Sequence, residues 1–125
     1  MLVFERSDKM EKTITIGGKE ILMRATAATP MHYRNQFKKD MMVELAAQEG
    51  KDLQNMDLGV FERMAYIFSG AFKNGVSLEE WLEQFDEITA LTEAIPDIMT
   101  FWEDNKETRM VSHPNEETVE SSTQA

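Results

Sequence analysis

The fold is decided by the stretch Lys12-Thr13-Ile14-Thr15-Ile16-Gly17-Gly18-Lys19-Glu20-Ile21-Leu22-Met23-Arg24. Polar and apolar residues alternate before the two glycines, which is typical of a β-strand with one buried face. A Gly-Gly pair suits a two-residue hairpin turn because both positions can take a positive φ. Residues 12–24 are therefore predicted to form a β-hairpin with Ile14 opposite Ile21. Since an isolated hairpin is only marginally stable in water, we expect it to pack on the rest of the chain.

A first helix is predicted over residues 30–48. Thr29 can cap it, and Pro30 suits its first position, where no backbone N–H is needed. Its apolar residues step by four along one stripe: Tyr33, Phe37, Met41 and Leu45. Because Met41 and Met42 are adjacent, they cannot both face the same core, so one of them is expected near the surface.

Capping residues mark the next two helices. Asp57 is predicted to cap a helix over residues 58–73, whose phenylalanines are expected in the core. Ser77 and Glu80 have the spacing of a capping box at the start of the following helix. These signals predict two further helices after the first.

The last apolar segments also have helical spacing. Periodicity continues over residues 86–95, and Pro96 predicts a kink or a break near Ile95 because proline removes a backbone donor. A final apolar face follows: Ile98, Met99 and Trp102. The sequence therefore predicts an α+β fold, mainly α, in which an N-terminal β-hairpin packs on a bundle of four to five helices.

The 125 residues fit a single folded domain. We expect it to cover residues 1–106, with the hairpin at 12–24 and the helices at 30–106. Apolar residues become sparse after that, so residues 107–125 are predicted to form a flexible acidic tail. Residues 1–11 receive no role from the pattern.

Charge and composition exclude several classes of protein. The net charge is −10, and the chain has no cysteine, so disulfides and thiolate metal sites are excluded. Residues 1–40 carry a net charge of +3 (8 basic, 5 acidic), and residues 41–125 carry −13 (5 basic, 18 acidic). Such an acidic body repels nucleic acid and favours a basic protein partner, although the net charge can also serve only to keep a small domain soluble. No long apolar segment or signal peptide is visible, so we expect neither membrane nor secretion.

Side chains typical of catalytic and metal sites are not grouped in the sequence. His32 and His113 stand far apart, without the neighbouring ligands that a zinc or di-iron centre needs. Several carboxylates on neighbouring turns are expected to form a solvated acidic face: Glu79, Glu80, Glu83, Asp86 and Glu87. We therefore expect no catalytic residues, no metal and no cofactor, and a protein that is not an enzyme.

Methionine is unusually frequent, with ten residues. Its flexible, polarisable side chain adapts to varied partners, although it also fills gaps in cores. Residues in the central third are therefore the candidate partner-binding residues: Met31, Met41, Met42, Leu45, Met56 and Met64.

Several segments, taken in order, resemble a known family. They are residues 14–21, Arg24-Ala25-Thr26-Ala27-Ala28-Thr29-Pro30, Trp81-Leu82-Glu83-Gln84-Phe85 and Ile95-Pro96-Asp97-Ile98, followed by Trp102. This order resembles the tail assembly chaperones of long-tailed, siphovirus-type bacteriophages and prophages of Gram-positive bacteria. The similarity covers about residues 12–106.

The resemblance implies a non-structural helper in the host bacterial cytoplasm. Such a protein binds the long, hydrophobic tape measure protein, keeps it soluble and helps tail tube subunits polymerise around it. The resemblance also implies a frameshift-extended form, through which the tail tube protein would be a second partner, and it is compatible with a homo-oligomer. Neither nucleic acid nor a membrane is an expected partner.

Two other functions remain open from the sequence. An acidic chain can mimic nucleic acid and inhibit a basic enzyme, although this requires charges spaced like phosphates. A small connector protein of the virion is the other alternative.

Overall fold

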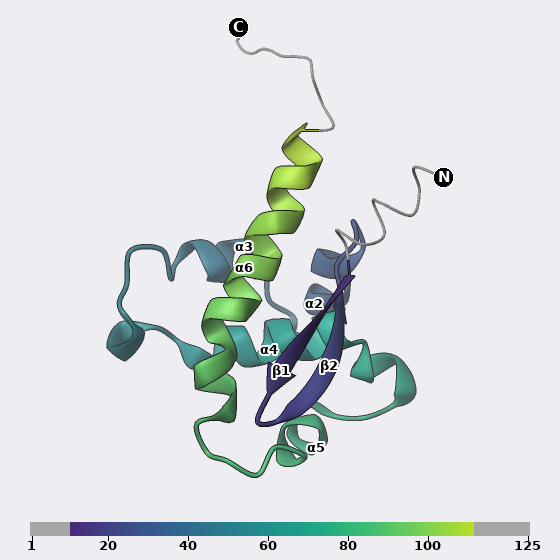
Figure 1. Ribbon diagram of the computed structural model, residues 1–125. Coiled ribbons are helices and arrows are strands. Elements are labelled where there is room, and N and C mark those ends of the chain that lie inside the picture. The colour runs from purple at the N-terminus through teal and green to yellow at the C-terminus, as the bar shows by residue number, and fades with distance from the viewer. Residues whose placement is uncertain (1–10, 112–125) are drawn as a thin grey trace, which may run out of the picture.

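The computed structural model describes residues 11–111, with side chains as far as residue 105 (Figure 1). Among these residues a two-stranded antiparallel hairpin packs against five α-helices, so the predicted α+β, mainly α fold is confirmed. The elements are β1 (Glu11–Ile16), β2 (Lys19–Arg24), α2 (Thr29–Phe37), α3 (Met41–Ala46), the 3-10 helix η1 (Leu53–Asn55), α4 (Leu58–Ser69), the 3-10 helix η2 (Ala71–Asn74), α5 (Leu78–Glu83) and α6 (Ala90–Val111). Residues 1–10 and 112–125, which include most of the predicted acidic tail, lie outside the described residues.

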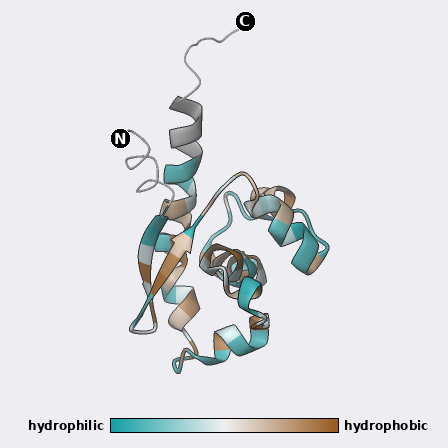
Figure 2. Ribbon diagram, turned by 90° about the vertical axis from the view of Figure 1, so that its right-hand side faces the viewer, coloured by the Kyte–Doolittle hydropathy of each residue, from teal (hydrophilic) through white to brown (hydrophobic). Residues whose placement is uncertain are grey.

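The hairpin has the predicted register, with Ile14 opposite Ile21. Gly17 and Gly18 form the turn with φ angles of +57° and +81°, values that side chains disfavour and glycine accepts. Hydrophobic segments occur in both strands (Figure 2). The strands pack on the helices, β1 against α6 and β2 against α4. This packing buries Ile14, Ile16 and Met23.

The single helix predicted over residues 30–48 is wrong, because the chain breaks between α2 and α3. Lys38 adopts a left-handed conformation with φ +59°, and its backbone N–H donates to the carbonyl of Arg34, which closes α2. The Asp40 carboxylate then accepts the backbone N–H of Val43 at 3.1 Å and starts α3. The apolar spacing did not show the break, because both helices keep the same stripe in or against the core: Tyr33, Phe37, Met41 and Leu45.

The predicted cap of the first helix is also wrong by one residue. Ala28 precedes α2, and Thr29 is its first residue. The Thr29 hydroxyl instead accepts the backbone N–H of Thr26 at 2.9 Å, so it stabilises the turn that leads into the helix.

The capping residues of α4 and α5 act as predicted. Asp57 accepts the backbone N–H of Gly59, and Ser77 and Glu80 form both bonds of a capping box. However, α4 ends at Ser69 and not at residue 73, because Gly70 turns left-handed with φ +78° and η2 follows. Two of the three phenylalanines expected in the core, Phe61 and Phe68, are buried. The third, Phe72, lies in η2 and is half-buried.

Helix α6 differs from its prediction at both ends. Residues 84–89 form a connection and not the start of a helix, and α6 begins at Ala90. The predicted break near Ile95 is wrong, since α6 continues through Pro96. Pro96 lies on the exposed side of the helix, where solvent can reach the backbone carbonyl that lacks its usual donor. The helix extends to Val111, so residues 107–111, predicted as the start of the tail, are helical.

A partly buried polar cluster connects α2, α3 and α4. Arg63 of α4 donates through Nε to the Tyr33 hydroxyl at 2.9 Å and through Nη2 to Glu44 Oε1 at 3.0 Å. The Tyr33 hydroxyl donates to the same Glu44 oxygen. Burial, reinforced by the hydrogen bond to Glu44, raises the pKa of Tyr33 well above its usual value.

Candidate functional site

The described residues offer little for catalysis or metal binding. Among residues 11–105, whose side chains the structure describes, no group of three or more His, Cys, Asp and Glu side chains is placed to hold a metal ion. His32 packs on the ring of Phe72, with ring centroids 4.8 Å apart, and His113 lies outside the described residues. No helix in this part of the chain combines the length and apolar character needed to cross a bilayer.

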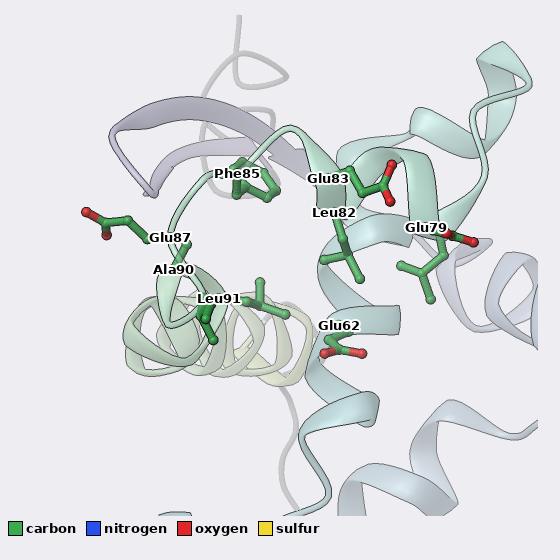
Figure 3. A pocket seen from close by; sticks show the side chains of 10 residues that line it. Glu62, Glu79, Leu82, Glu83, Phe85, Glu87, Ala90 and Leu91 are labelled. Atoms are coloured by element: carbon green, nitrogen blue, oxygen red, sulfur yellow. The ribbon is translucent and has the colours of Figure 1, made fainter.

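A groove of about 490 Å³ lies where α4, α5 and the start of α6 meet (Figure 3). Its apolar lining comes from α5, from the connection 84–89 and from α6: Leu78, Leu82, Phe85, Ile88, Ala90 and Leu91. Figure 3 shows Leu82 and Leu91 on different elements beside the same hollow, with Glu62 of α4 bordering it. We refer to this feature as the groove.

Local chemistry explains why the groove forms. The capping box fixes the first residue of α5, which places Leu78 and Leu82 one turn apart on the same side of the helix. Trp81 is buried in the core. Its ring packs edge-on against the ring of Phe85, with ring centroids 5.2 Å apart. Phe85 thereby holds the beginning of the connection, and buried Ala90 holds its end.

Four glutamates are also among the residues that line the groove. Glu62 is half-buried, and Glu79, Glu83 and Glu87 are exposed. In Figure 3, Glu87 extends on one side of the connection, and Glu79 and Glu83 lie on the other. No Lys, Arg or His is among the described residues that line the groove. Three residues of the acidic face expected from the sequence, Glu79, Glu83 and Glu87, thus line an apolar groove, whereas Glu80 and Asp86 do not.

Ile88 is fully exposed to solvent, with a relative accessible surface of 100% for the residue. A single exposed apolar residue is common on protein surfaces. Here, however, the side chain borders a groove that already exposes leucines from two helices. The continuous helix expected over residues 86–95 would have placed Ile88 on a buried face, so the sequence reading missed it. The available signal is Thr89, whose residue type favours helix starts and which hydrogen bonds to Glu93 at 3.1 Å.

The six candidate partner-binding residues are not brought together on one surface. Met41 and Met64 are fully buried and Leu45 is nearly so, because the stripe of α2 and α3 and the centre of α4 form the core. Met31 and Met42 are exposed. The exposure of Met42 beside buried Met41 agrees with the expectation that one residue of this adjacent pair lies near the surface. Met56 is half-buried. Together with Leu45 it lines a second, smaller cavity of about 210 Å³.

The comparisons with known proteins identify no relative of this chain. No protein-family model, curated protein or solved structure matches this chain.

Proposed function

We propose that this protein is a non-catalytic tail assembly chaperone that binds the tape measure protein of a siphovirus-type bacteriophage and keeps it soluble. The proposal rests on the order of sequence segments that resemble this family, and on the groove. It includes assistance to tail tube polymerisation and a location in the host bacterial cytoplasm.

The observation that carries the proposal is an accessible apolar groove on a strongly charged protein. A chaperone for an apolar helical client needs exposed apolar surface that the client can cover, together with enough charge to remain soluble. The groove offers Leu82, Leu91 and the fully exposed Ile88. The net charge of −10 supplies the solubility.

The same groove is poorly suited to acid–base chemistry. Paired carboxylates act as acid and base when burial moves their pKa values apart. Glu79, Glu83 and Glu87 are all exposed to solvent. We therefore assign binding, and no bond-making step, to this site.

Co-expression with the tape measure protein tests the proposal. The soluble fraction of the tape measure protein is expected to rise several-fold in the presence of this chain. The double variant Leu82→Ser/Ile88→Ser should lose most of that gain. The matched control Val43→Ser/Leu53→Ser, which removes two exposed apolar side chains outside the groove, should keep it. Equal solubility with and without the wild-type chain would refute the proposed function.

A further inference from the structure

The rim of the groove carries charge of a single sign. Glu62 comes from α4, Glu79 and Glu83 from α5, and Glu87 from the connection 84–89. Three separate parts of the chain therefore contribute carboxylates to the groove. Any segment that covers this lining has to place its own flanking side chains close to these carboxylates.

The charges decide which segments can stay there. Exposed ion pairs add little affinity individually, but complementary rims increase the association rate and exclude like-charged partners. A segment with Asp or Glu beside its apolar stripe would bring like charges together as water is displaced. A segment with Lys or Arg at those positions would instead neutralise the rim.

The lining favours a helical occupant. Apolar side chains at i, i+3, i+4 and i+7 of an amphipathic helix commonly fill a groove between helices. The volume of about 490 Å³ lies within the range of about 300–1,000 Å³ typical of pockets that accept apolar groups. Several side chains of one helix face can therefore be accommodated, while the helix backbone stays outside.

We propose that the groove selects a cationic amphipathic helix of the client, with an apolar stripe over Leu82, Ile88 and Leu91 and with Lys or Arg on both flanks facing the glutamates. This inference rests on the proposed function in taking the groove as the client site. A second copy of this chain is a poor occupant, because residues 41–125, which contain the groove, carry a net charge of −13.

Two synthetic peptides of about 18 residues, or five helical turns, test the selection. Both carry the same Leu/Ile stripe, and the flanking positions are Lys in one and Glu in the other. Fluorescence anisotropy with the full chain is expected to show at least about tenfold tighter binding of the Lys peptide at about 50 mM NaCl. The preference should shrink at about 500 mM, where charges are screened. Equal affinities, or a preference for the Glu peptide, would overturn the inference.

A charge-matched pair of variants separates the rim from the net charge. The variant Glu79→Gln/Glu83→Gln/Glu87→Gln removes three exposed rim charges. The control Glu20→Gln/Glu49→Gln/Asp97→Asn removes three exposed charges outside the groove. We expect the preference for Lys to collapse in the rim variant and to persist in the control. An equal loss in both variants would overturn the inference, as would a dimer of the free chain that Ile88→Asp abolishes.

The peptide and co-expression experiments fail independently. If the tape measure protein is solubilised but the peptides bind without charge preference, the cationic helix is wrong and the proposed function stands. If the Lys peptide binds with rim-dependent preference but the tape measure protein gains no solubility, the proposed function is wrong and the selectivity of the groove stands.

Discussion

A Cβ atom placed on Gly17 would lie 3.0 Å from the Cβ of Ala90. Gly17 is at the tip of the hairpin and Ala90 is the first residue of α6, so these two elements lie close together at the edge of the groove. It is closer than ordinary side-chain packing allows, and Gly17 also has a φ of +57°. The close approach of the hairpin turn to Ala90 and Phe85, two residues that line the groove, therefore leaves little room for a side chain at position 17.

The variant Gly17→Ala should lower the free energy of unfolding by about 2–4 kcal/mol, from left-handed strain and from overpacking against Ala90. Urea denaturation measures this loss. The control Gly18→Ala has a similar φ of +81° but nothing within 4 Å of its Cβ, so only the strain remains and the loss should be about 1–2 kcal/mol. Equal losses would mean that the contact with Ala90 is unimportant.

Replacing Arg63 with Met should destabilise the fold by about 1–3 kcal/mol, because partly buried Glu44 loses its charged donor. The control is Lys39→Met, since Lys39 pairs with the same carboxylate only at 3.8 Å and from the surface. Its expected effect is within about 0.5 kcal/mol. Similar losses from the two substitutions would contradict the structural role of the cluster.

The two tyrosines of the chain should resist ionisation in the folded state. Burial raises the pKa of Tyr33, with help from Glu44, and burial followed by the charge of Glu80 raises the pKa of Tyr66. Absorbance of tyrosinate should therefore appear near the ordinary pKa of about 10 in urea and at higher pH in the native protein.

The same shifts predict how stability depends on pH. A raised pKa means that the folded state holds the proton more tightly, so this contribution is complete below pH 10 and is lost as pH rises further. Unfolding midpoints should fall above pH 10, and the fall should be shallower in Tyr33→Phe. An unchanged slope in that variant would show that Tyr33 does not contribute.

Ser77→Ala should cost about 1 kcal/mol by removing one bond of the capping box. Because this box sets the start of α5, the variant should also weaken client binding through Leu78 and Leu82. Thr100→Ala, at an exposed position within α6, serves as the control and should leave stability within about 0.5 kcal/mol. If the Ser77→Ala protein is destabilised but keeps full affinity for the client, the capping box is not needed to position Leu78 and Leu82 for binding.

Mass spectrometry of purified phage particles distinguishes a helper from a virion component. If the chain is an assembly chaperone, as we propose, it should be missing from finished particles and present in the lysate. Stoichiometric recovery from virions would favour the connector alternative.

Turn and capping signals, which depend only on residues close together in the sequence, predicted the hairpin and two helix starts correctly. Gly17-Gly18 defined the hairpin register, and Asp57 and the pair Ser77 and Glu80 marked real helix starts. Periodicity was less reliable, because spacing by four continues across the break at Lys38. It also assigned Ile88 to a buried face, although this side chain is fully exposed.

The groove could not be predicted because its walls come together only in the folded chain. Glu62 and Glu87 are distant in sequence, and they line one site because α4 packs beside α5 and α6. The acidic residues of α5 were recognised in the sequence as a solvated face. Their position around an apolar hollow depends on the connection 84–89, whose non-helical path the apolar spacing concealed.

Because some methionine side chains are exposed and others are buried, peroxide should oxidise them at different rates. Among the methionines whose side chains the structure describes, Met31 and Met42 are exposed, whereas Met23, Met41 and Met64 are buried in the core, so the exposed pair should form sulfoxides before the buried ones. No methionine is among the described residues that line the groove. Within the described part of the chain, oxidation should therefore begin on the surface around α2 and α3 and leave the leucines and isoleucine of the groove chemically intact.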